Sequence, residues 1–188
     1  MGLFLALPTA DVAALFMHRE VLLGRGLAVL AAWVLLNLIG SGYYLAHADR
    51  RHESFYFHAL NVLWNLVNAG LAAWGILRLH FHPPAGLDAA ELLSTQHFYE
   101  TLFGVNAVLD VLYVLAGSYL RGRAAWPDQS RPERLLGYGR SLWVQGGFLL
   151  LFDGVQFAAH HRHGRQLYPL LSRVRIGPGA VAVSWPVR

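Results

Sequence analysis

The sequence predicts an all-α protein: a bundle of four transmembrane helices in up-down order, with a short extramembrane C-terminal tail. Hydrophobic residues make up 55% of the 188 residues and charged residues only 14%, whereas soluble domains carry roughly a quarter charged residues. The apolar residues also gather in four blocks, and each block is long enough to supply the roughly 20 residues that cross a bilayer core. A soluble helical bundle, the competing fold, would carry a polar stripe along every helix, and these blocks contain only scattered polar residues.

The four blocks define one membrane domain over residues 1–160. We expect helices at about residues 22–45, 55–77, 98–120 and 136–160. Pro83 and Pro84 end the second helix, and Asp88–Leu93 form one or two interfacial turns before the third. Because the connections are short, sequential helices are expected to lie side by side. Met1–Ala10 lacks the basic start of a signal peptide, so an interfacial lead-in is favoured over a cleaved leader.

Residues 161–188 follow as the extramembrane tail. The alternating apolar residues around Gly177-Pro178-Gly179 favour a small hairpin or an extended strand. The first connection carries Arg50 and Arg51, and the third carries four further arginines, whereas the second carries Arg78 beside two acids. The positive-inside rule therefore places the first and third connections in the cytoplasm and both termini outside.

The basic pI of about 9.8 comes with no basic stripe interleaved with aromatic residues, so we expect no nucleic-acid partner. The positive charge instead sits in the short connections. The expected partner is the lipid bilayer, together with either further copies of the chain or a larger membrane complex.

Polar residues inside the apolar blocks are the candidates for a site, because each is costly in a bilayer unless a partner satisfies it. In the second and third helices they recur at i, i+4, i+7, which places them on one face. The candidates from the four helices are Asn37, Asn61, Asn65, Asn68, Asn106, Asp110, Tyr113, Arg140, Gln145, Asp153 and Gln156. They form either a structural network of interhelical hydrogen bonds or a polar cavity for an ion, a proton or a small ligand.

The two carboxylates allow a more specific hypothesis. Arg140 lies near the cytoplasmic start of the fourth helix, and its side chain would reach toward Asp110. Arg25 lies on the outer side with Asp153. These positions predict two ion pairs that close the bundle at different depths. The alternative is that each acid is protonated and hydrogen-bonded, because burial disfavours the charged form.

The histidines are a second group of candidate residues, here for a metal site. Most of them fall on the predicted outer side, and imidazole is a common metal ligand. The candidate ligands are His80, His82, His97, His160 and His161. Their spacing matches no metal-binding motif, and His58, a conceivable axial haem ligand, has no second membrane histidine opposite it. We therefore expect no particular cofactor.

Motifs of catalysis are absent from the sequence. It has no cysteine, Walker loop, dinucleotide fingerprint or G-x-S-x-G elbow. The sequence therefore leans away from an enzyme without deciding the question.

Three segments resemble a known family: FHALNVLWNLVNAG (57–70), LDVLYVLAGSYL (109–120) and GYGRSLWVQGGFLLLFD (137–153). The family is an uncharacterised group of small bacterial four-helix membrane proteins, a domain of unknown function, and the resemblance extends over about residues 27–159. It implies a bacterial cytoplasmic (inner) membrane location and draws attention to residues such as Asn61, Asn65, Asp110, Arg140 and Asp153. No reaction, ligand or partner is implied.

Three classes of function follow from these observations. The leading prediction is a non-enzymatic structural or accessory subunit, whose interior would be dry with every polar group paired. The alternative is a small transporter, channel or ligand-binding bundle that uses Asp110, Asp153 and the asparagine face, with a wet cavity reaching one surface. A lesser alternative is a metal- or haem-dependent redox protein.

Overall fold

The chain folds into four long antiparallel helices followed by a pair of short strands. The computed structural model describes residues 9–81, 89–171, 174–177 and 180–183. The helices are α1 (Thr9–His47), α2 (Glu53–Phe81), α3 (Ala89–Ala124) and α4 (Pro132–Leu171). The strands β1 (Val174–Gly177) and β2 (Ala180–Val183) pair antiparallel, in the segment where the alternating pattern favours a hairpin.

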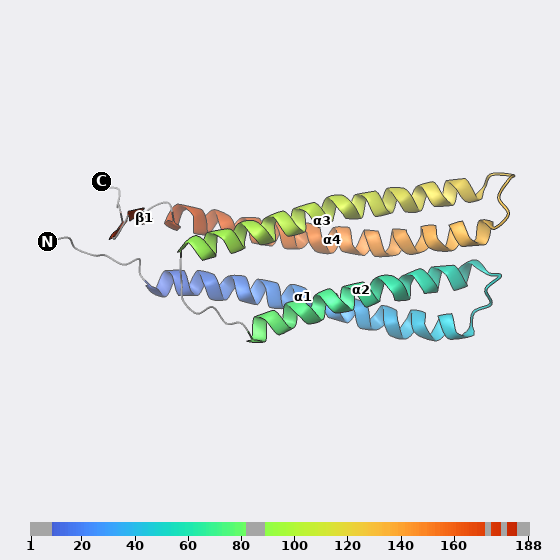
Figure 1. Ribbon diagram of the computed structural model, residues 1–188, viewed down its shortest axis with the longest axis horizontal. Helices are drawn as coiled ribbons and strands as arrows, with labels where there is room; N and C mark the ends of the chain where they lie inside the picture. Colours follow the sequence, from blue (N-terminus) through green and yellow to red (C-terminus); the bar gives the residue numbers. More distant parts are fainter. Residues whose placement is uncertain (1–8, 82–88, 172–173, 178–179, 184–188) are drawn as a thin grey trace.

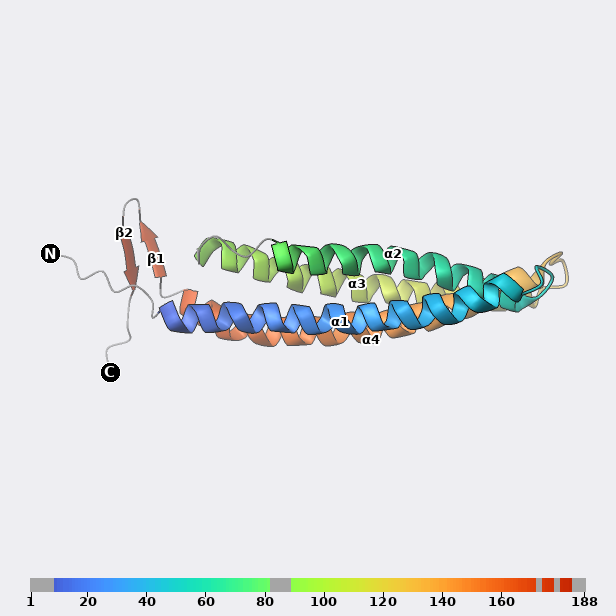
Figure 2. The same cartoon turned by 90° about the horizontal axis from the view of Figure 1, so that it is seen from below.

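The helices pack as two hairpins that lie against each other (Figures 1 and 2). The closest partners are α3 with α4 and α1 with α2, and α4 also packs on α2 and, less extensively, on α1. In contrast, α2 and α3 hardly touch. We call the end where α1 turns into α2 and α3 into α4 the loop end, and the end where α1 begins and α4 finishes the terminal end.

Small residues set the closest helix contacts, as they commonly do in bundles of transmembrane helices. A side chain at Gly139 would come within 2.8 Å of the Gly117 carbonyl oxygen on α3, and one at Gly146 within 3.2 Å of the Asp110 carbonyl oxygen. A side chain at Gly137 would overlap the backbone of α2. These glycines let α4 approach both α3 and α2.

All four helices are longer than the apolar blocks that predict them. α1 begins at Thr9 rather than near residue 22, and α4 runs past His160 to Leu171. Residues 89–93, expected as separate interfacial turns, belong to the first turns of α3. Met1–Pro8, His82, Pro83 and Pro84 lie outside the described residues. The differences arise because hydropathy marks only the apolar part of a helix, whereas backbone hydrogen bonding continues into its polar ends.

Each helix is long and apolar enough to cross a membrane. Large apolar side chains are exposed along all four helices, for example Leu36, Leu63, Val108 and Leu151. The buried interior is unusually polar by comparison, with Asn65, Gln96, Ser141 and His160 among the fully buried side chains. Apolar residues therefore face outward and polar residues inward, the arrangement that suits a bilayer.

Candidate functional site

A hydrogen-bonded group of polar side chains, which we call the amide network, joins α2 and α4 in the half of the bundle near the loop end. Its centre is Asn61, whose Oδ1 accepts hydrogen bonds from Ser141 Oγ (2.7 Å) and Gln145 Nε2 (3.1 Å). The Asn61 Nδ2 donates to Ser41 Oγ on α1 (3.3 Å). All four of these side chains are buried, and every one of these bonds connects two different helices.

The amide network continues onto α1 through Gln145. Its Nε2 also donates to Asn37 Oδ1 (3.2 Å), and its Oε1 accepts from Trp33 Nε1 (3.0 Å). The His58 ring nitrogen Nδ1 lies 3.1 Å from Ser41 Oγ, and the ring stacks on Tyr44. Three of the predicted candidates, Asn37, Asn61 and Gln145, therefore belong to one network of the kind expected for a structural core.

The predicted ion pair between Asp110 and Arg140 is wrong. Arg140 Nη1 instead donates to Glu53 Oε1 at the start of α2 (2.8 Å), in an exposed position at the loop end. The register of α3 against α4 explains the difference, because Asp110 lies level with Gly146. Arg140 is six residues away, a distance of roughly 9 Å along the helix axis.

The predicted pair between Asp153 and Arg25 is also wrong. Arg25 is exposed on α1, whereas Asp153 is buried and lies beside Asp110 and Asn106. Two neighbouring buried carboxyl groups with no cation paired to them among the described residues do not both ionise, because burial and the like charge disfavour the second anion. Asp110 and Asp153, which we call the carboxyl pair, thus match the protonated alternative rather than the ion pairs.

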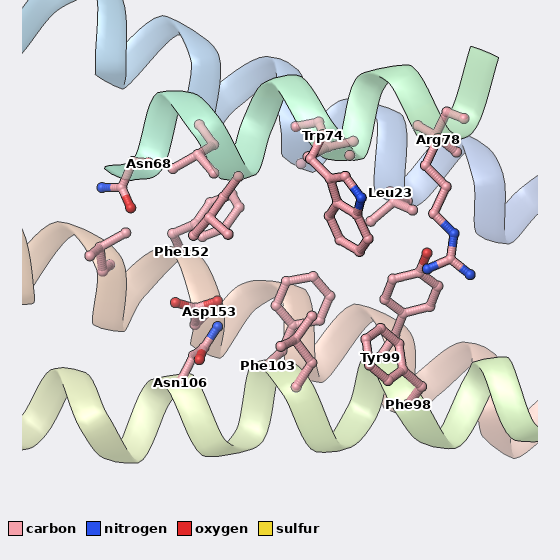
Figure 3. A pocket seen from close by; sticks show the side chains of 18 of the residues that line it. Leu23, Asn68, Trp74, Arg78, Phe98, Tyr99, Phe103, Asn106, Phe152 and Asp153 are labelled. Carbon is pink, nitrogen blue, oxygen red and sulfur yellow. The ribbon is translucent and has the colours of Figure 1, made fainter. Parts of the chain in front are cut away.

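A cleft of about 430 Å³ occupies the other half of the bundle, where α2 and α3 separate (Figure 3). Trp74 and Arg78 on α2 face Phe98, Tyr99 and Phe103 on α3 across it. Leu23 from α1 and Phe152 from α4 contribute to the remaining walls. Several lining residues, including Leu71, Trp74 and Phe98, are themselves exposed. The cleft is therefore open sideways, between two helices, and not only at the end of the bundle.

The cleft ends on polar side chains near the middle of the bundle, which we call the polar floor: Asn68, Asn106, Asp110 and Asp153. Asn68 is 5% exposed and Asp110 only 3% exposed. Among the described residues, Asn68 Nδ2 and Asp110 Oδ2 have no hydrogen-bond partner. One is a donor and the other an oxygen that accepts or, if protonated, donates, so together they suit a hydroxyl, a carbonyl or a water molecule.

The remaining candidates lie close to these two groups. Tyr113 lines the cleft with its ring edge against Trp64. Asn65 is fully buried and donates to the Asn61 carbonyl oxygen (2.8 Å), while Gln156 is buried against Gly26 of α1. The sequence predicts one polar interior, whereas the structure contains two separate polar groups. One is the hydrogen-bonded amide network, and the other is the polar floor, in which some atoms have no partner among the described residues.

The candidate metal ligands do not converge. His80 and His97 are exposed, His161 lies 3.6 Å from Glu100 Oε2, and His160 is buried with its ring stacked on Tyr99 and Phe103. His82 lies outside the described residues. Over the ranges that the structure describes, no three His, Asp or Glu side chains are grouped as a metal site would need.

A buried polar group at the terminal end was missed from the sequence. Glu100 accepts hydrogen bonds from Gln96 Nε2 (2.8 Å) and the Tyr168 hydroxyl (3.1 Å). Arg19 and His163 are buried in the same region. The expected helices begin at residue 98 and end at residue 160, so Gln96 and Tyr168 fell outside them. Gln96 and Glu100 are four residues apart, which places them on one face of a helix. This spacing was the sequence signal that could have indicated the group.

The fold and cleft define a four-helix protein with an apolar exterior and a lateral cleft ending on carboxyl and amide groups. The chain belongs to a family of unknown function, DUF6992, whose model matches residues 29–154. That range contains the amide network and the polar floor. No curated protein and no solved structure matches the chain.

Proposed function

We propose that this chain is an integral protein of the bacterial cytoplasmic membrane that binds a small amphiphile, taken from the bilayer, in the cleft between α2 and α3. The observation that carries the proposal is the cleft itself. It has an apolar, aromatic wall, a lateral opening and a polar floor with unpaired buried atoms. Binding sites for small molecules typically combine such walls with a few convergent polar groups.

The exterior supports a membrane location. Exposed leucine, valine and isoleucine side chains run along every helix, and a soluble monomer rarely exposes so large an apolar surface. In a bilayer the gap between α2 and α3 faces hydrocarbon, which gives a lipid-soluble molecule a route into the cleft without crossing water. The arginines of the two connections at the loop end favour a cytoplasmic position for that end.

The polar floor supports ligand binding over a purely structural interior. A buried donor or acceptor without a partner costs about 1–3 kcal/mol, so a ligand group that pairs with the floor gains free energy of that order. A ligand hydroxyl or carbonyl, or water associated with the ligand, would satisfy Asn68 and Asp110 together. The amide network accounts for helix association in the other half of the bundle, and a structural subunit alone would leave the cleft without a role.

The test compares two bulky substitutions on α2 with similar exposure. Leu71 lines the cleft and is 55% exposed, whereas Leu66 is 56% exposed and lies outside the lining. Native mass spectrometry in mild detergent would measure hexadecanol binding to wild type, Leu71→Trp and Leu66→Trp. We expect stoichiometric binding that Leu71→Trp reduces at least tenfold and Leu66→Trp leaves unchanged. Binding that is absent, or equal in both variants, would contradict the proposal.

A further inference from the structure

Arg19 is a buried cation with weak partners. Its side chain lines the terminal end of the cleft and is 4% exposed. Its two hydrogen bonds, to the Leu92 carbonyl oxygen and to Glu20 Oε1, are both 3.4 Å long, whereas charge-assisted bonds are about 2.7–2.9 Å. Its Nε has no partner among the described residues. Buried charges are normally well paired, so Arg19 has unused capacity to bind an anion.

Arg78 on α2 brings a second guanidinium to the same end of the cleft. It lies in the last turn of α2, with its guanidinium over the Trp74 ring (5.8 Å). Figure 3 shows it beside the Tyr99 hydroxyl, at the edge of the cleft. Within the described part of the chain no carboxylate lies within 4 Å of Arg78. Glu20 is the one carboxylate at this end of the lining. Glu100 lies outside the lining and is hydrogen-bonded to Gln96 and Tyr168.

The cleft between these arginines and the polar floor is long and narrow. Thr95 and Asp110 both line it from α3, and their separation in sequence corresponds to roughly 20 Å along the helix. A volume of about 430 Å³ spread over that length suits one extended hydrocarbon chain rather than two. Aromatic side chains, among them Phe103 and Phe152, line its middle.

We propose that the ligand is a single-chain amphiphile with an anionic carboxylate or phosphate head, held by Arg19 and Arg78. Its chain lies along the aromatic middle of the cleft, and water pairs with Asn68 and Asp110 between the end of the chain and the polar floor. This inference rests on the proposed function and specifies its ligand class. Guanidinium groups match carboxylate and phosphate oxygens in geometry as well as charge. Arg19 lies in the first third of α1 and Arg78 in the last turn of α2, so both lie toward the terminal end of the bundle.

The experiment uses probes that share one chain and differ in the head. Native mass spectrometry and competition binding would compare hexadecanoate, hexadecyl phosphate, hexadecanol and hexadecyltrimethylammonium on the full-length protein. We expect both anions to bind at least tenfold more tightly than the alcohol, and the ammonium compound to bind most weakly. Equal binding of anions and alcohol would overturn the anion site while leaving the proposed function intact. A failure of every probe to bind would overturn both.

Three variants test whether the preference for an anionic head comes from Arg19 and Arg78. Arg19→Gln and Arg78→Gln should each weaken hexadecanoate about tenfold, the loss of one hydrogen bond to a charged group, without changing hexadecanol. Arg25→Gln, on the exposed face of α1 outside the cleft, is the matched control and should change neither probe. Arg78 is exposed, so its variant remains informative even if loss of the buried Arg19 prevents folding.

A diacyl lipid is the competing ligand with the same head chemistry. Phosphatidylglycerol that binds as tightly as hexadecanoate and is equally sensitive to Arg19→Gln would overturn the single-chain assignment.

Discussion

Asn61 joins three helices through one amide group. Its oxygen accepts from Ser141 and Gln145, and its nitrogen donates to Ser41. Removing it would leave two buried donors of α4 without their shared acceptor. Bonds of this kind in membrane proteins contribute about 0.6 kcal/mol on average and up to about 1.7 kcal/mol, so several together are needed to fix one arrangement of the helices.

We expect a double-mutant cycle of Asn61→Ala and Ser141→Ala to give a coupling energy of about 1–1.7 kcal/mol, because their 2.7 Å bond is the shortest of the amide network. The free energy of unfolding would be measured by titration with a denaturing detergent. A cycle pairing Asn61→Ala with Ser118→Ala, a serine exposed on α3, should show no coupling. Equal coupling in both cycles would indicate a general effect of the alanine at position 61.

The identities of the interior polar residues could be predicted from the sequence, but their partners could not. Asn68, Asn106, Asp110 and Asp153 stand out because an amide or a carboxyl in an apolar block is costly without a purpose. Which of them meet depends on the axial register of α3 against α4, and the sequence does not encode that register in any periodic pattern. Arg19 does not stand out in the sequence, because its burial depends on the extension of α1 to Thr9 and of α3 to Ala89.

At the scale of helices, Gly139 lets α4 approach α3 closely, whereas Gly147 on the same helix does not contribute to that contact. A methyl group at Gly139 would lie 2.8 Å from the Gly117 carbonyl oxygen and 2.7 Å from Arg121 Cγ. A backbone carbonyl cannot move aside without moving its helix. A methyl group at Gly147 meets no described atom within 4 Å. Two glycines on one helix therefore have opposite sensitivities to substitution.

We expect Gly139→Ala to destabilise the fold by about 1–3 kcal/mol, as overpacking does in a tight interface. Gly147→Ala should be neutral or stabilising by up to about 1 kcal/mol, because alanine has the higher helix propensity. The measurement is the free energy of unfolding of both variants in one detergent. Equal destabilisation by the two substitutions would contradict the close contact between α3 and α4.

The number and order of the helices could be predicted, whereas their ends could not. Four apolar blocks give four helices, because only hydrogen-bonded helices satisfy the backbone in lipid. The polar turns at the terminal end carry no hydropathy signal, so α1 and α4 are longer than the blocks within them. Those polar turns contain Arg19 on α1 and His163 on α4, which lie outside the helices expected from the sequence.

At the scale of the whole molecule, the separation of α2 from α3 could not be predicted. All four helices present apolar residues outward, and a lipid-facing surface has the same composition as a surface facing another helix. The opening depends on which pairs of helices pack closely, and α4 packs on every other helix while α2 and α3 hardly touch. The cleft follows from that asymmetry.

The orientation of the bundle in the membrane can be tested with single cysteines, because the natural chain has none. Ser130→Cys reports the loop end and Gln166→Cys the terminal end, and both positions are exposed. An impermeant maleimide applied to intact spheroplasts should label position 166 and not 130, with the reverse in inverted vesicles, because the arginines favour a cytoplasmic loop end. The opposite pattern would reverse the proposed orientation.

The central claim, that the cleft holds an amphiphile, is tested most directly by photolabelling in a bilayer. A hexadecanoate probe with a diazirine along its chain would be incorporated into proteoliposomes, irradiated, and its adducts located by peptide mass spectrometry. The account predicts adducts at Leu102, Phe103 and Phe152 that excess hexadecanoate removes, and adducts at outward-facing Leu36 and Leu151 that it does not. Labelling spread evenly over the exposed residues and insensitive to competitor would contradict the account.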